Sequence, residues 1–123
     1  MTEDLFTKRD VRNIESIVKH CGTIEEAVQL FGSEVEDFID NVHFQNDCFF
    51  ALSQIGEIVK RLSSELKANY SNVDWSDIAK LRDIIAHNYE SIELLVIWGI
   101  ITEEVSPLKE KCERILKEKK SKW

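Results

Sequence analysis

Residues 49–66 read FFALSQIGEIVKRLSSEL, and their apolar side chains recur three or four positions apart. This spacing places the apolar side chains on one face of an α-helix, whereas a half-buried strand would alternate. The same pattern continues upstream and predicts one long helix over residues 33–67, with a break near 43–46. Within the quoted stretch the stripe consists of Phe49, Leu52, Ile55, Val59, Leu62 and Leu66.

The rest of the chain shows the same helical period. Thr7 and Thr23 each precede an acidic residue by three positions, which is typical of a helix start. Gly22 and Gly32 are expected to end the first two helices, and Pro107 is expected to bend the last one. The further helices are predicted over residues 7–21, 23–31, 74–89 and 91–119.

The composition excludes the common β architectures. The chain has 123 residues but only four glycines and one proline, whereas a sandwich or barrel needs turn residues every ~8–12 positions. The predicted fold class is therefore all-α, an up-and-down bundle of four to five helices with short connections. The length suits a single domain over residues 1–123, with a basic tail over 118–123 that is expected to fray.

The charge limits the kinds of partner. The formal net charge is −7, so the chain as a whole does not attract nucleic acid passively. Most of the excess negative charge lies in residues 1–61, while residues 62–123 are close to neutral. A contact with a polyanion is therefore expected in the second half.

Cysteine usage and hydropathy indicate a reducing, aqueous compartment. Cys21, Cys48 and Cys112 are odd in number and widely spaced, so neither a disulfide framework nor a zinc site is expected. The acidic N-terminus does not resemble a signal peptide. The longest apolar run, residues 94–101, is far shorter than the ~20 residues that cross a bilayer. We expect a cytoplasmic protein without a membrane partner.

The helix predicted over residues 74–89 carries the side chains that suit catalysis. Arg82 falls within an apolar arc of this helix, where a charged group usually has a partner. Asp83 and His87 are four apart, so the carboxylate is expected to orient the imidazole. Arg82 and His87 are five apart and point about 140° away from each other around the helix axis.

Two interpretations of this pattern remain open. In the first, the aliphatic part of the Arg82 side chain lies along the apolar arc while its guanidinium reaches solvent, and His87 is a structural residue. Alternatively, both side chains reach one phosphate along the helix edge, or a two-fold axis assembles a composite site from two copies. Spacing alone does not decide between them.

The segment RDIIAHNY at 82–89 resembles the Arg-x4-His-x-Tyr signature of HepT-like toxins, which belong to the HEPN superfamily of helical ribonucleases. Further stretches of the chain match the family, and they occur in the same order as in the family. The resemblance therefore covers roughly residues 44–118. These stretches are LSQIGE at 52–57, KRLS at 60–63, WSDI at 75–78 and LVIW at 95–98.

The resemblance implies a homodimeric, metal-independent endoribonuclease that needs no cofactor. Arg82 and His87 would be its catalytic pair, with Asp83 and Asn88 in supporting positions. The chemistry suits RNA, because the 2′-hydroxyl is a nucleophile already next to the scissile phosphate. An imidazole can transfer protons near neutral pH, and a guanidinium can stabilise the charged phosphorane.

The resemblance also implies a partner. Toxins of this family are usually paired with an MNT-type nucleotidyltransferase antitoxin, which adds AMP to the motif tyrosine. That residue would be Tyr89 here. On the predicted helix Tyr89 lies on the same face as Arg82, so that added phosphates would be able to pair with this arginine.

Two functions other than a ribonuclease are consistent with a helical chain of this composition or need to be compared with it. A non-enzymatic helical dimer that binds a nucleotide or a nucleotidyltransferase partner is the main alternative, and the acidic net charge favours it. A four-helix metal protein requires Glu-x-x-His pairs, which the sequence lacks. His20 is expected near the C-terminal end of the first helix, as a structural residue.

Overall fold

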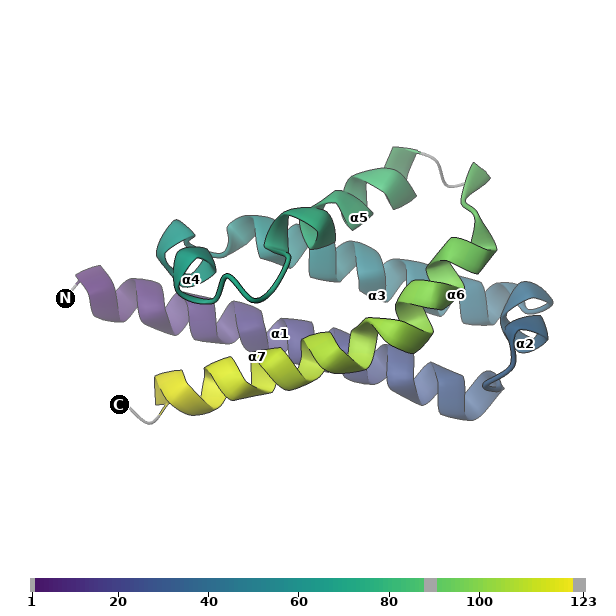
Figure 1. Ribbon diagram of the computed structural model, residues 1–123, viewed down its shortest axis with the longest axis horizontal. Helices are drawn as coiled ribbons and strands as arrows, with labels where there is room; N and C mark the ends of the chain where they lie inside the picture. Colours follow the sequence, from purple (N-terminus) through teal and green to yellow (C-terminus); the bar gives the residue numbers. More distant parts are fainter. Residues whose placement is uncertain (1, 88–90, 121–123) are drawn as a thin grey trace.

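The computed structural model describes residues 2–87 and 91–120, and every regular element in those ranges is a helix (Figure 1). The all-α prediction is therefore confirmed, although the described residues form seven α-helices where four to five were expected. They are α1 (Thr2–Phe31), α2 (Val35–Ile39), α3 (Val42–Arg61), α4 (Ser64–Asn69), α5 (Trp75–His87), α6 (Leu94–Glu103) and α7 (Val105–Lys120).

Helix α1 continues through Gly22, so the predicted helix end at this residue is wrong. The buried stripe of α1 runs on across Gly22 from Cys21 to Ile24, and this burial outweighs the ~1 kcal/mol that glycine costs in a helix. Gly32, which has a φ of 130°, ends the helix as predicted. His20 consequently lies in the middle of α1 and not near its end, and its ring meets the edge of Phe50.

The long helix predicted over 33–67 is three helices, because two polar side chains cap new starts. Asn41 accepts hydrogen bonds from the backbone N–H groups of His43 and Phe44, at 2.9 and 3.2 Å, and begins α3. Ser63 accepts one from Leu66 at 3.1 Å and begins α4. Such side chains satisfy the free N–H groups of a first turn, so the breaks lie at 40–41 and 62–63 and not near 43–46.

A buried carboxylate ties α1 to the start of α4. Asp10 is the one charged side chain that is buried among those described. It accepts hydrogen bonds from both the backbone N–H and the hydroxyl of Ser63, at 3.0 and 2.5 Å. Asp10 therefore acts across 53 positions of sequence, whereas its spacing from Thr7 predicted a local helix cap.

Pro107 lies in the first turn of α7 and does not bend a continuous helix. The break comes at Glu104, between α6 and α7. A proline in the first turn is tolerated because its missing N–H would have no partner within the helix there. The basic end of the chain is helical as far as Lys120, and the remainder of the expected tail lies outside the described residues.

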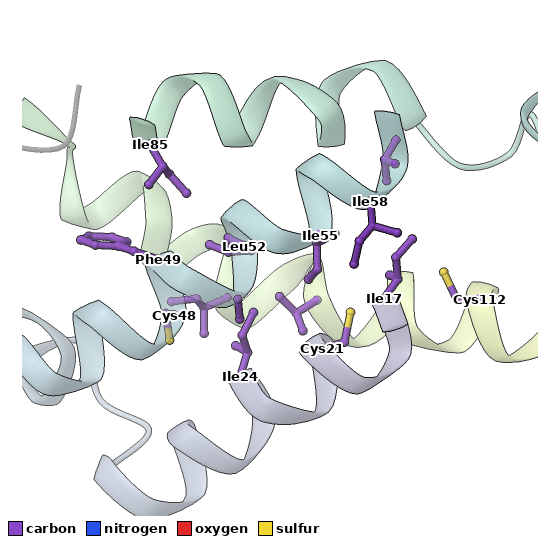
Figure 2. Packing of buried hydrophobic residues seen from close by; sticks show 14 of the residues in the cluster. Ile17, Cys21, Ile24, Cys48, Phe49, Leu52, Ile55, Ile58, Ile85 and Cys112 are labelled. Atoms are coloured by element: carbon purple, nitrogen blue, oxygen red, sulfur yellow. The ribbon is translucent and has the colours of Figure 1, made fainter. Parts of the chain in front are cut away.

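The helices form an up-and-down arrangement in which both ends of the chain lie at the same end of the molecule (Figure 1). α3 packs between α1 and α5, and α7 packs against α1. Side chains from α1, α3 and α7 meet in the core that Figure 2 shows. None of the helices in the described ranges has the length and hydropathy to cross a membrane. This scaffold holds α5, the helix of interest, against α3.

Candidate active site on the seam between helices α3 and α5

Gly56 sets the distance between α3 and α5 at the position of Arg82. A Cβ atom at Gly56 would lie 2.9 Å from the backbone nitrogen of Arg82 and 3.0 Å from its Cβ. It would also lie 3.0 Å from the carbonyl oxygen of Ile78. Such distances are too short for any side chain, so glycine permits the close approach. This contact fixes where Arg82 leaves the surface of α5.

We expect Gly56→Ala to destabilise the protein although alanine is the better helix former. Overpacking costs about 1–3 kcal/mol, while the gain in helix propensity is about 1 kcal/mol. The net loss in the free energy of unfolding is therefore about 1 kcal/mol. Gly22→Ala is the matched control, because a Cβ there would meet nothing within 4 Å, and it is expected to stabilise. Urea unfolding that shows both variants stabilised would contradict the close-approach argument.

The seam is the line along which α5 packs on α3. Arg82 reaches the protein surface at this seam and is not buried in the apolar interior. Its side chain is 42% exposed, and its Nε lies 3.2 Å from Oε2 of Glu57 on α3. The cation therefore has a partner, as its place in an apolar arc predicted, but the helical pattern of α5 alone did not show that this partner is Glu57. One feature of the sequence could have indicated Glu57 as this partner: it directly follows Gly56 in the stretch LSQIGE at 52–57.

Asp83 pairs with Lys60 and Arg82, so the predicted pairing of Asp83 with His87 is wrong. Lys60 on α3 donates a hydrogen bond to Oδ1 of Asp83 at 2.9 Å, and NH1 of Arg82 lies 3.5 Å from the same oxygen. The hydrogen bond from Lys60 is the main reason that the pKa of Asp83 lies below its usual value, and the charge of Arg82 adds to it. Glu57, Arg82, Asp83 and Lys60 thus alternate in sign along the seam.

His87 closes the described part of α5, and its side chain is exposed. It lies on the same helix as Arg82, but Arg82 bonds to Glu57 and Asp83 and not to His87. The structure of one chain therefore presents the two groups at the surface without joining them. Asn88 and Tyr89 lie outside the described residues.

A shallow hollow of about 450 Å³ lies between α3 and α5 near His87. Ile85 and Ala86, the two residues before His87, form the α5 side of this hollow. Phe50 on the α3 side is 62% exposed. An exposed aromatic ring at the rim of this hollow is a surface on which an unpaired base can stack. The α3 side consists of Asn46, Phe49, Phe50 and Ser53.

The cysteines are poor candidates for catalysis. Burial raises the pKa of Cys21, Cys48 and Cys112 to about 12, so these thiols stay protonated and unreactive. Among the described residues, no three side chains of His, Cys, Asp or Glu gather where they could hold a metal ion. Of the described residues that the sequence pattern singled out for catalysis, Arg82, Asp83 and His87 all lie on α5, and Arg82 and Asp83 are in contact.

The comparisons with known proteins show what the whole chain is similar to. The family model described as "Ribonuclease HepT-like" matches residues 11–115. "Putative RNase TTE0752" of Caldanaerobacter subterraneus subsp. tengcongensis is 32% identical over 107 residues, which are 87% of this chain and 94% of the relative. "Probable ribonuclease HepT" of Thermococcus cleftensis is 31% identical over 99 residues, 76% and 90% of the two chains. No solved structure matches the chain.

Proposed function

Because the chain belongs to the HepT-like ribonuclease family, we propose that it is a metal-independent endoribonuclease whose catalytic residues are Arg82 and His87. The observation that carries the proposal is the placing of both groups at the surface of α5, with the guanidinium held at the seam by Glu57. Asp83 is proposed as a supporting residue that holds the Arg82 guanidinium in place while no RNA is bound. Asn88 is proposed as a second supporting residue.

The proposed reaction needs only proton transfer and charge stabilisation. The RNA 2′-oxygen attacks the adjacent phosphorus, the bond to the 5′-oxygen breaks, and the proton of the 2′-hydroxyl passes to a base. His87 suits this transfer and the protonation of the leaving oxygen. Arg82 offers charged donors to the phosphorane. The products are a 2′,3′-cyclic phosphate and a 5′-hydroxyl.

A homodimer would complete the site. Arg82 and His87 point in different directions on one straight helix, so a second copy related by a two-fold axis is proposed to bring pairs together in one pocket. Exposed apolar side chains on α3, α5 and α6 support an association of this kind, since apolar surface favours a protein contact. They are Phe50, Ile84, Leu95 and Val96.

The regulation that we propose follows from the family motif, in which Tyr89 comes two residues after His87 in the sequence. A nucleotidyltransferase partner would transfer AMP from ATP to its hydroxyl, and pyrophosphate would leave. The added phosphate would carry negative charge to the end of α5, where it would compete with RNA for Arg82. The chain would then act as a toxin that its partner neutralises.

A non-enzymatic dimer that binds a nucleotide or such a partner remains the second candidate. It is favoured by the net charge of −7 and by the two carboxylates that neutralise Arg82. Both features weaken the attraction of a long polyanion. Nucleotide binding without any cleavage of RNA would identify this function.

We expect the purified chain to cut single-stranded RNA in the presence of EDTA. Because the nucleophile is the 2′-hydroxyl, the same sequence made with 2′-O-methyl groups is expected to stay intact. The products, analysed by mass spectrometry, are expected to carry 2′,3′-cyclic phosphate and 5′-hydroxyl ends. Cleavage that EDTA abolishes, or products with 3′-hydroxyl ends, would contradict the proposed mechanism.

A further inference from the structure

Two cations from different helices converge on one carboxylate oxygen at the seam. Nζ of Lys60 lies 2.9 Å and NH1 of Arg82 lies 3.5 Å from Oδ1 of Asp83. The side chains of Lys60 and Arg82 are 37% and 42% exposed. A ligand from solvent can therefore reach both nitrogens.

We propose that Lys60 and Arg82 together bind one phosphate of the RNA, and that the carboxylate of Asp83 occupies this place when RNA is absent. The inference rests on the proposed ribonuclease function and adds Lys60 as a residue that touches the substrate. A carboxylate oxygen and a phosphate oxygen are equivalent as anionic acceptors for lysine and arginine donors. The position of Oδ1 therefore marks where a phosphate oxygen can lie.

Asp83 is able to leave this position at low cost. Its side chain is 50% exposed, and ion pairs of exposed groups contribute little to stability. Water can solvate the displaced carboxylate, while a phosphate with two free oxygens bridges the two cations. Asp83 thus competes with the substrate instead of assisting its binding.

Glu57 stays in place during this exchange. It contacts Nε of Arg82, whereas the contact with Asp83 is made by NH1. The guanidinium therefore keeps one anchor on α3 while its terminal nitrogens turn to the ligand. This division of the donors allows a phosphate to replace Asp83 without freeing the arginine side chain.

The test measures binding of a short fluorescent single-stranded RNA in a His87→Ala background, in which cleavage is expected to be too slow to consume the RNA during the measurement. Adding Lys60→Gln is expected to weaken binding about fivefold at 0.1 M salt and to reduce the slope of log K against log salt by about 0.7. Lys80→Gln removes the same charge from an exposed position on α5, next to Asp77. This control is expected to change the affinity by less than twofold.

Asp83→Asn provides the second readout, because it removes the competing charge. RNA binding is expected to tighten severalfold, which a merely structural role for Asp83 would not produce. The inference is overturned if Lys60→Gln behaves like Lys80→Gln while wild type still cuts RNA, or if Asp83→Asn weakens binding. A wild-type protein that neither binds nor cuts RNA would instead overturn the proposed function, and the inference with it.

Discussion

Replacing His87 or Arg82 with alanine is expected to reduce the rate of RNA cleavage at least about 100-fold while the helical fold persists. Proton transfer by a positioned side chain contributes about 10²–10⁴-fold to a rate, and loss of one donor to a developing charge costs about 10²–10³-fold. Both side chains reach solvent, so their removal leaves no cavity. Cleavage rates and circular dichroism of the same preparations provide the measurement.

The control for these two variants is Lys80→Ala, which truncates an exposed cation on α5. It is expected to retain the wild-type rate within about twofold. Arg82→Ala also breaks the ion pair with Glu57, which is worth about 0.2–1 kcal/mol for exposed groups, so its midpoint of unfolding is expected to fall by only a few degrees. An unfolded His87→Ala protein, or one that cuts RNA normally, would favour a structural role for this residue.

Phe38→Ala is expected to lower the free energy of unfolding by about 3–5 kcal/mol. The side chain of Phe38 is 0% exposed. Its ring centroid lies 5.1 Å from that of Phe44 on α3 and 5.5 Å from that of Trp98 on α6. Truncation would leave a cavity where α2, α3 and α6 meet, and neighbouring rings on rigid helices cannot collapse fully into it. Urea unfolding followed by circular dichroism measures the loss.

Phe50→Ala is the matched control for Phe38→Ala, since the same side chain is removed from a surface position of α3. At protein concentrations where the chain is monomeric, a change within about 0.5 kcal/mol is expected, because the Phe50 side chain is exposed there. Equal losses for both variants would show that the cluster around Phe38 is not the centre of packing that the ring contacts indicate. A loss for Phe50→Ala alone would indicate that the Phe50 side chain is covered in solution, as in the proposed dimer.

The periodic stripes were sufficient to predict the helical class, because burial of one helix face is a property of local spacing. They also placed Arg82 and His87 on a single helix, and the structure bears this out. The helix ends were harder to predict. Gly22 and Gly32 are the same residue type, yet only Gly32 ends a helix. The difference depends on whether the buried face continues beyond the glycine, which requires knowledge of the neighbouring helices.

The sequence by itself therefore determined the all-helical class and the helix that carries Arg82 and His87. Only the tertiary structure decided the partners: Glu57 for Arg82, Lys60 for Asp83, and Ser63 for Asp10. The spacing of Asp83 and His87 allowed a pair within one helix, but the Asp83 carboxylate instead accepts a hydrogen bond from Lys60, which lies 23 positions away in the sequence. The physical reason is that a charged side chain binds the strongest partner within reach, and the packing of α5 on Gly56 determines which groups are within reach.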